Sequence, residues 1–162
     1  MTHGENGGWL HAKDFQYKEE EIWRSFEEVP SLTGKPKIFL FQCCRGDKVD
    51  YGEPLNVLSC HPPTKMKDPP LPKNADFFVV HSAPIGYESW KSPDGAWLIQ
   101  DFCTQLEKNA AKKDLAKIMT LVANSMSKRL SNAENEKKSL KKQVPVTTST
   151  LTKLMYFCKQ NQ

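Results

Sequence analysis

The stretch Ile38-Phe39-Leu40-Phe41-Gln42-Cys43-Cys44-Arg45-Gly46 decides the fold of this chain. Its first four residues are a continuous apolar run, which is typical of a β-strand covered on both faces, as in a parallel sheet between helices. Cys44 follows close behind this run, and His3 lies upstream in a glycine-rich turn. A cysteine at the carboxyl end of a buried strand, with such a histidine, is the arrangement that cysteine-protease chemistry needs.

Length and composition indicate a single globular domain. The chain has 162 residues, of which 38% are hydrophobic and 10% aromatic, enough for a sizeable core. No apolar stretch approaches the length of a membrane span, and Met1 is not followed by a signal-peptide pattern. Five cysteines at irregular spacing, without a CxxC pair, favour free thiols in a reducing compartment, so we expect a cytoplasmic protein.

The sequence predicts neither a metal site, nor a cofactor, nor a nucleic-acid interface. Cys60-His61 is the only adjacent thiol–imidazole pair, and no partner pair lies at ligand spacing. The net charge is +4. Many of the lysines lie between Phe102 and Tyr156, and no aromatic residue lies among them. Nucleic-acid binding would favour interleaved aromatics, so these charges indicate a solvated helix face and an exposed loop.

Residues 54–73 divide the chain into two halves. Six prolines fall in this range, and proline can neither pair within a sheet nor continue a helix. We therefore predict a linker at 54–73 between a first part at 1–53 and a second part at 74–159, with a short tail at 160–162.

In the first half we expect a glycine-rich turn at 4–8 and then a short helix near 17–26. Ile22 and Phe26, one turn apart, would lie on the buried side of this helix. The acidic run Glu19-Glu20-Glu21 lies near its start, where it suits the helix dipole.

In the second half, Phe77-Phe78-Val79-Val80 predicts another fully apolar strand and residues 96–112 a helix. Asp114 is a good N-cap for a second helix. That helix carries its apolar residues on one stripe, namely Leu115, Ile118, Met119, Val122, Met126 and Leu130.

The remaining segments complete an α/β layered fold around a largely parallel sheet. Residues 131–142 are polar and predict a loop, whereas residues 144–150 and 154–157 are β-prone. Pro145 indicates that the first of these lies at a sheet edge or is short, and the final pair is expected to be an antiparallel addition.

Several segments then resemble one family. Gln42-Cys43-Cys44-Arg45-Gly46 resembles the Q-A-C-R-G box of caspases, with Cys43 where the family usually has alanine. His3-Gly4-Glu5-Asn6-Gly7 resembles the S-H-G-E-x-G segment. Further matches follow in order along nearly the whole chain: Leu32 to Lys37, Ala75 to Phe78, Gly86 to Trp90, Asp94 to Gln100, Lys142 to Pro145 and Leu151 to Phe157. The chain is thus similar to an animal effector-type caspase that lacks its N-terminal strands.

The resemblance implies a three-layer caspase-like fold and assigns the chemistry. It also implies that residues 1–53 are the C-terminal part of a caspase large subunit, that 54–73 link the subunits, and that 74–159 form the small subunit. Cys44 would be the nucleophile, and His3 would carry a proton to the leaving amine. The backbone N–H groups of Gly4 and Cys44 would form the oxyanion hole. Cys43 would point to the opposite face of the strand and belong to the core.

Caspases cleave proteins after aspartate, so the resemblance also implies a cationic pocket. Gln42 would contribute to it, and Lys91, after Ser89-Trp90, stands where the family has an arginine. Lysine keeps the charge but not the two-pronged contact with a carboxylate, so Lys91 is either a pocket residue or an ordinary surface lysine. The family's other arginine lies upstream of the histidine segment, where this chain has no residues. Ser89 would also bind the substrate, and Trp90 and Trp97 would line neighbouring subsites.

Processing and assembly follow from the same resemblance. Asp50 and Asp68 are candidate cleavage sites for activation of a zymogen, or else ordinary acids of the loop and linker. The family dimerises through its last strand, placed here at Leu154–Phe157, so a homodimer or a heterodimer with another caspase is expected. Because the family has further strands before the histidine segment, we expect this chain to fold poorly alone or to need a partner strand.

Two functions remain open. The first is a cysteine endopeptidase that cleaves after aspartate in apoptosis, which the presence of Cys44 and His3 favours. The second is a catalytically impaired regulator that binds a full-length caspase, which Lys91 and the absent upstream arginine favour.

Overall fold

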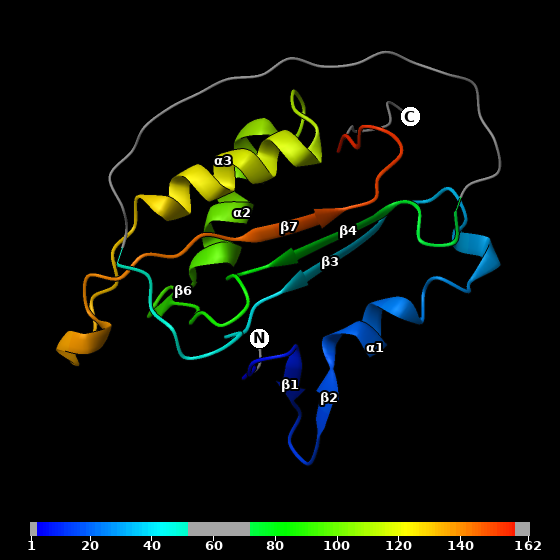
Figure 1. Ribbon diagram of the computed structural model, residues 1–162. Helices are drawn as coiled ribbons and strands as arrows, with labels where there is room; N and C mark the ends of the chain where they lie inside the picture. The colour runs from blue at the N-terminus through cyan, green and yellow to red at the C-terminus, as the bar shows by residue number, and fades with distance from the viewer. Residues whose placement is uncertain (1–2, 52–71, 158–162) are drawn as a thin grey trace.

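A three-stranded sheet lies at the centre of the computed structural model, which describes residues 3–51 and 72–157 (Figure 1). Strand β3 (Lys37–Phe41) runs parallel to β4 (Phe77–His81), and β7 (Val146–Ser149) pairs antiparallel with the other edge of β4. The expected buried strands, the edge position near Pro145 and the antiparallel addition of this segment are confirmed. The sheet joins the two halves of the chain, since β3 precedes the predicted linker and β4 follows it.

Helices α2 (Trp97–Asn109) and α3 (Leu115–Ser127) cover one face of this sheet (Figure 1). Asp114 caps α3 as predicted, because its side chain accepts a hydrogen bond from the Lys117 backbone N–H at 3.2 Å. The expectation for Leu130 is wrong: α3 ends before it, and its side chain is 51% exposed.

The core on this face is almost wholly apolar. Phe78 and Val80 of β4 point into it, and alternation along the strand sends Val79 to the other face. The buried cluster consists of Phe78, Val80, Trp97, Leu98, Leu115, Ile118, Met119, Val122 and Met126.

The opposite face carries helix α1 (Glu19–Arg24) and the hairpin of β1 (Trp9–His11) with β2 (Gln16–Lys18) (Figure 1). A smaller apolar cluster lies here, formed by Leu10, Phe41, Cys43 and Val79. The helix is shorter than predicted. Phe26 lies beyond its end and is 38% exposed, so it does not share the half-buried position of Ile22.

The short elements lie in the connections between these layers. A hairpin of β5 (Lys91–Ser92) and β6 (Gly95–Ala96) precedes α2. Two 3₁₀ turns, η1 (Pro30–Leu32) and η2 (Glu136–Lys138), interrupt the loops before β3 and β7. The expected loop at 131–142 is therefore present, with η2 inside it.

The expectation of a strand at Leu154–Phe157 is wrong. The segment has no strand pairing, and its backbone instead accepts a hydrogen bond at Met155 O from Leu115 N at 2.8 Å. Met155 and Phe157 pack against the apolar cluster, while Leu154 is 68% and Tyr156 44% exposed. These helix contacts replace the strand ladder that the β-prone composition predicts.

The three layers confirm the α/β fold. Nearly all of the predicted linker at 54–73, the candidate cleavage site Asp68 and the tail at 160–162 lie outside the described residues, so the division into subunits stays a prediction. Within residues 3–51 and 72–157, no helix is long and apolar enough to cross a bilayer.

Candidate active site

Two neighbouring cysteines follow β3, and they lie in different surroundings. Cys43 is 4% exposed and belongs to the apolar cluster beneath α1. Burial raises the pKa of the Cys43 thiol to about 11, with a further contribution from the nearby Glu19 carboxylate, so this thiol stays protonated. Cys44 is half-buried. Of these two thiols, Cys44 is therefore the one available for chemistry.

The Cys44 sulfur lies against the segment that carries Ser89. The Ser89 backbone N–H donates to Cys44 Sγ at 3.4 Å, and Sγ lies 3.8 Å from the Ser89 carbonyl oxygen. Two segments from opposite sides of the linker thus meet at the thiol.

Backbone hydrogen bonds fix the loop after Cys44 to residues 86–88. Arg45 N donates to Tyr87 O at 3.0 Å, and Gly86 N donates to Arg45 O at 2.7 Å. At Gly46 the backbone adopts φ +149°, and a Cβ there would meet the Gly86 backbone at 2.5 Å. Only glycine at position 46 allows the two segments to approach this closely.

His3 and Gly4 pair antiparallel with β1 and lie against the same loop. His11 N donates to His3 O at 3.0 Å, and Glu5 N donates to Trp9 O at 2.9 Å. A Cβ on Gly4 would collide with the carbonyl oxygen of Cys44, so the absence of a side chain there permits direct backbone contact. The His3 side chain is exposed, and within the described residues it makes no hydrogen bond or ion pair.

An open hollow of about 340 Å³ lies beside this contact, lined by Gly4, Glu5, Asn6, Gly46 and Asp47. In the part of the chain that the structure describes, the backbone N–H groups of Gly4 and Cys44 donate no hydrogen bond. Two N–H donors without a protein partner at one site can serve a developing oxyanion.

The side-chain amides of two glutamines hold Ser89 and Trp90 beside the Cys44 thiol. Gln42 Nε2 donates to Ser89 Oγ at 2.6 Å, whereas Gln42 Oε1 is buried without a partner among the described residues. Gln143 Nε2 lies 3.3 Å from the same hydroxyl, and Gln143 Oε1 accepts from Trp90 N at 2.7 Å. Gln143 is 3% exposed, and its bridging role is not apparent from the sequence.

The remaining predicted subsite residues differ in how far they are exposed. Lys91 is exposed at the start of β5, two residues beyond Ser89. Trp90 is half-buried, and its indole N–H donates to Lys142 O at 3.3 Å. Trp97 is 5% exposed and packs in the core beneath α3, with little surface left to contact a substrate. Its subsite role stays a prediction.

The 131–142 loop reaches the site through an ion pair. Lys138 Nζ lies 2.5 Å from Glu88 Oε1, and Glu88 is the neighbour of Ser89. This hydrogen bond raises the pKa of Lys138 above its ordinary value. Near the base of the loop, Lys142 N donates to Asp50 O at 2.9 Å. The backbone of Asp50, a candidate cleavage site, therefore forms an antiparallel β-bridge with Lys142.

Comparison with known proteins identifies the family. The caspase domain family matches residues 1–156 of this chain. The chain belongs to the caspase family. It is 36% identical to caspase-1 of Spodoptera frugiperda over 99% of its length, covering 54% of that relative. It is 31% identical to caspase drICE of Drosophila melanogaster (97% of this chain, 48% of the relative) and 35% to chicken (Gallus gallus) caspase-6 (97% and 56%).

A solved caspase has the same fold. The crystal structure of Spodoptera frugiperda caspase-1 superposes with a TM-score of 0.85 at 36% identity, over 99% of this chain and 62% of that one. The resemblance and the caspase-like three-layer fold expected from the sequence are confirmed. The chain spans about half the length of the curated relatives that it matches.

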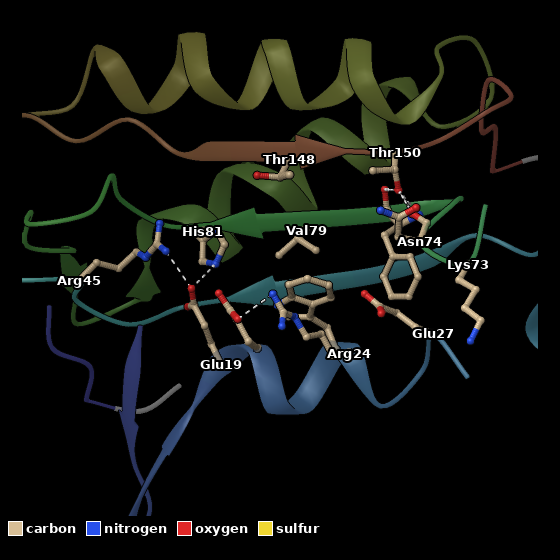
Figure 2. Close-up of a pocket in the computed structure, with 13 residues that line it drawn as sticks. Glu19, Arg24, Glu27, Arg45, Lys73, Asn74, Val79, His81, Thr148 and Thr150 are labelled. Atoms are coloured by element: carbon tan, nitrogen blue, oxygen red, sulfur yellow. Dashed lines mark hydrogen bonds and ion pairs between the residues drawn. The ribbon is translucent and has the colours of Figure 1, made fainter. Parts of the chain in front are cut away.

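One cluster in this caspase chain is absent from the sequence-based predictions. Glu19, Arg45 and His81 meet behind the Cys44 loop, beside a cavity of about 670 Å³ between α1 and the sheet (Figure 2). The sequence offers Glu19 only as one of three acids at a helix start, and His81 as a histidine without a matching motif. Within the described residues, no three His, Cys, Asp or Glu side chains are placed to hold a metal ion.

Proposed function

We propose that this chain acts as a cysteine endopeptidase that cleaves proteins after aspartate in programmed cell death. Cys44 is the nucleophile, and His3 carries the proton to the leaving amine. The backbone N–H groups of Gly4 and Cys44 stabilise the oxyanion. The observation that carries this proposal is the direct contact between the Gly4 position and the Cys44 carbonyl, which joins the histidine turn to the cysteine loop.

The chemistry requires one available thiol and two N–H donors beside it. The raised pKa of Cys43 supports Cys44 as the reactive member of the pair. The peptide carbonyl would enter the hollow beside Gly4 and Gly46, where its oxygen could accept hydrogen bonds as negative charge develops. Such donors contribute roughly 3 kcal/mol each in related acyl transfer.

We further propose that Gln42, Ser89 and Lys91 bind the substrate aspartate. Gln42 and Ser89 are already joined by a 2.6 Å hydrogen bond, and Lys91 supplies an exposed cation two residues away. A lysine contributes a point charge rather than a planar fork, so its contact with a carboxylate has fewer directional constraints than that of arginine.

The test is turnover of a peptide with aspartate at the cleavage position, by the wild-type chain and by Cys44→Ala. Cys43→Ala is the matched control, because the neighbouring thiol is buried and protonated. We expect Cys44→Ala to abolish turnover and Cys43→Ala to retain it. Equal rates for wild type and Cys44→Ala would refute the enzymatic proposal for this chain.

A second candidate is a regulator that binds a complete caspase without cleaving peptides. The observation that favours it is Lys91 in place of the family's arginine. It predicts co-purification with a full-length caspase that Cys44→Ala leaves unchanged, together with absent turnover by the wild type.

Dimerisation is proposed through β7, which is the last strand of the described residues, in place of Leu154–Phe157. Thr150 N donates to Phe77 O at 2.8 Å, so alternation along the strand turns the N–H groups of Thr147 and Ser149 away from β4. Thr147→Pro removes one outward donor and should lower the sedimenting mass from dimer to monomer. An unchanged mass with intact folding would exclude this edge.

Location and processing complete the proposal. The described cysteines Cys43, Cys44 and Cys103 are free thiols, which supports action in the cytoplasm. We propose activation by cleavage after Asp50 or Asp68. Mass spectrometry of the chain treated with an active caspase would identify either site, and an uncut chain would exclude both.

A further inference from the structure

Three ionisable side chains are buried together behind the Cys44 loop. Glu19 Oε1 accepts a hydrogen bond from Arg45 Nη2 at 2.8 Å and lies 3.1 Å from His81 Nε2 (Figure 2). Glu19 is 6%, Arg45 8% and His81 7% exposed. We call these residues the buried triad.

The buried triad carries an energetic cost that apolar residues would not. Glu19 Oε2, Arg45 Nε and both ring nitrogens of His81 have no hydrogen-bond partner in residues 3–51 and 72–157, although His81 Nε2 lies within ion-pair distance of Glu19 Oε1. Burial acts to raise the pKa of Glu19, but the contacts and charges of His81 and Arg45 outweigh it, so the pKa is lowered. Glu19 is therefore ionised at neutral pH. Well-packed apolar residues at such positions are often as stable or more stable, so stability alone does not explain the charges.

The triad connects the segments that form the site. Glu19 N donates to Gly8 O at 2.9 Å. A Cβ added to Gly8 would lie 3.2 Å from the Glu19 side chain, so this side chain packs against the turn that begins near His3 and Gly4. Arg45 directly follows Cys44.

His81 ends β4 immediately before Ser82. The Ser82 hydroxyl donates to Cys43 O at 2.9 Å, and the Cys43 backbone N–H donates to Ser82 Oγ at 3.3 Å. The triad thus contacts the histidine turn, the cysteine loop and the carboxyl end of the central strand.

We propose that Glu19 is a positioning residue of the active site, which holds the Cys44 loop against the His3 turn through Arg45 and His81. Its side chain fixes the guanidinium of Arg45, and the Arg45 backbone in turn holds residues 86 and 87. This inference rests on the proposed function only for its kinetic consequence; the positioning itself concerns the loop.

Glu20 provides a matched control. It is the next residue of the same helix, and it pairs with Arg24 at 3.0 Å with both side chains more than half exposed. Glu19→Gln and Glu20→Gln therefore remove the same charge from adjacent positions, one within the triad and one in solvent.

The first measurement is kinetic and uses the whole chain with an aspartate peptide. Active sites are counted with an irreversible thiol-directed inhibitor, so that unfolded molecules do not lower kcat. We expect Glu19→Gln to lower kcat at least tenfold with KM within twofold, and Glu20→Gln to change both less than twofold. Equal kcat for the two variants overturns the proposal.

The second measurement is amide hydrogen exchange, which does not depend on turnover. We expect Glu19→Gln to accelerate exchange at least tenfold in residues 44–48 and 86–88, while α3 stays within twofold of wild type. Acceleration that includes α3 to the same degree would indicate a purely structural role and overturn the proposal. If the wild type lacks turnover, the proposed function fails, and exchange alone decides the positioning.

Arg45→Lys keeps the experiment decisive if Glu19→Gln does not fold. Lysine preserves the buried charge but not the forked contact. We expect faster exchange confined to the same two segments and a kcat between those of wild type and Glu19→Gln. Wild-type exchange and kcat in Arg45→Lys, at unchanged KM, would overturn the role assigned to this contact.

Discussion

The two faces of the sheet are built differently. On one face, α2 and α3 bury Phe78, Val80 and their neighbours in an apolar cluster. On the other face, a smaller apolar cluster lies next to the buried triad and a cavity of about 670 Å³. Adjacent residues of a single strand, Val79 and Val80, face these two environments.

This difference separates stability from function. The face beneath α2 and α3 carries the larger of the two apolar clusters. The face beneath α1 retains buried charge and empty space next to the loop that carries Cys44. Removing side chains should therefore cost most stability on the first face and most site geometry on the second.

The largest expected effect on stability is on the α3 face. Ile118 is 0% exposed, and Ile118→Ala should lower the free energy of unfolding by about 3 kcal/mol, since it leaves a cavity among packed side chains. Urea denaturation measures this change. Leu130→Ala, at a 51% exposed position, is the control and should cost less than about 0.5 kcal/mol. Similar costs for the two variants would contradict the placement of the core.

The direct comparison of the faces is Val80→Ala against Val79→Ala. Val80 is 0% exposed within the larger cluster, so its truncation should cost roughly 2 kcal/mol. Val79 is 5% exposed and lines the cavity. Val79→Ala should lower the free energy of unfolding by about 1 kcal/mol, because the truncated side chain loses fewer packing contacts. The urea midpoints of the two variants measure this difference in stability. A larger loss of stability for Val79→Ala would contradict the conclusion that the α2–α3 face contributes more to stability.

A smaller effect concerns the carboxylate at the start of α3. Burial acts to raise the pKa of Asp114, but the hydrogen bonds from Lys117 outweigh it and lower that pKa below its ordinary value of 3.8. The stabilisation is therefore complete above pH 3.8 and is lost as the pH falls through the lower folded value. Asp114→Ala should cost about 1 kcal/mol at pH 7.

The control for Asp114→Ala is the same measurement under acid conditions. Thermal unfolding of wild type and variant should converge as the pH falls below the ordinary value of the carboxyl. A stability difference that is constant from pH 7 into that acid range would show that the carboxylate charge is not responsible.

The smallest effect is expected for the ion pair at the 131–142 loop. The Lys138 side chain is 49% exposed, so solvent screens its attraction to Glu88. Lys138→Met should change the free energy of unfolding by less than about 0.5 kcal/mol. Chemical denaturation with and without 0.5 M salt would check this, as a large salt-dependent loss would mean that the loop is integral to the fold.

Local rules predicted the elements whose signals lie within a few residues. The apolar run at 77–80 gave a buried strand, and Asp114 capped its helix, because strand burial and capping depend on near neighbours. Leu130 fell outside its helix because the stripe of apolar residues continues beyond the helical backbone. At Leu154–Phe157 a β-prone composition was outweighed by contacts with α3 that the sequence does not display.

The site divides along the same line. The box around Cys44 and the segment at His3 could be recognised because each is contiguous. The roles of Glu19, His81 and Gln143 could not, since their partners lie far away in the sequence: Glu19 and His81 are separated by 62 positions. Trp97 was assigned to a subsite by its segment, but the tertiary packing buries it.

The pairing of β3 with β4 has a consequence for a nicked molecule. The covalent connection between the two strands passes through residues 52–71. A cut in this range breaks that connection and leaves both strands intact. The parallel ladder and the contacts of Cys44 with Ser89 would then join two separate polypeptides. Such a protein would run as two bands under denaturing conditions and as one species in native solution.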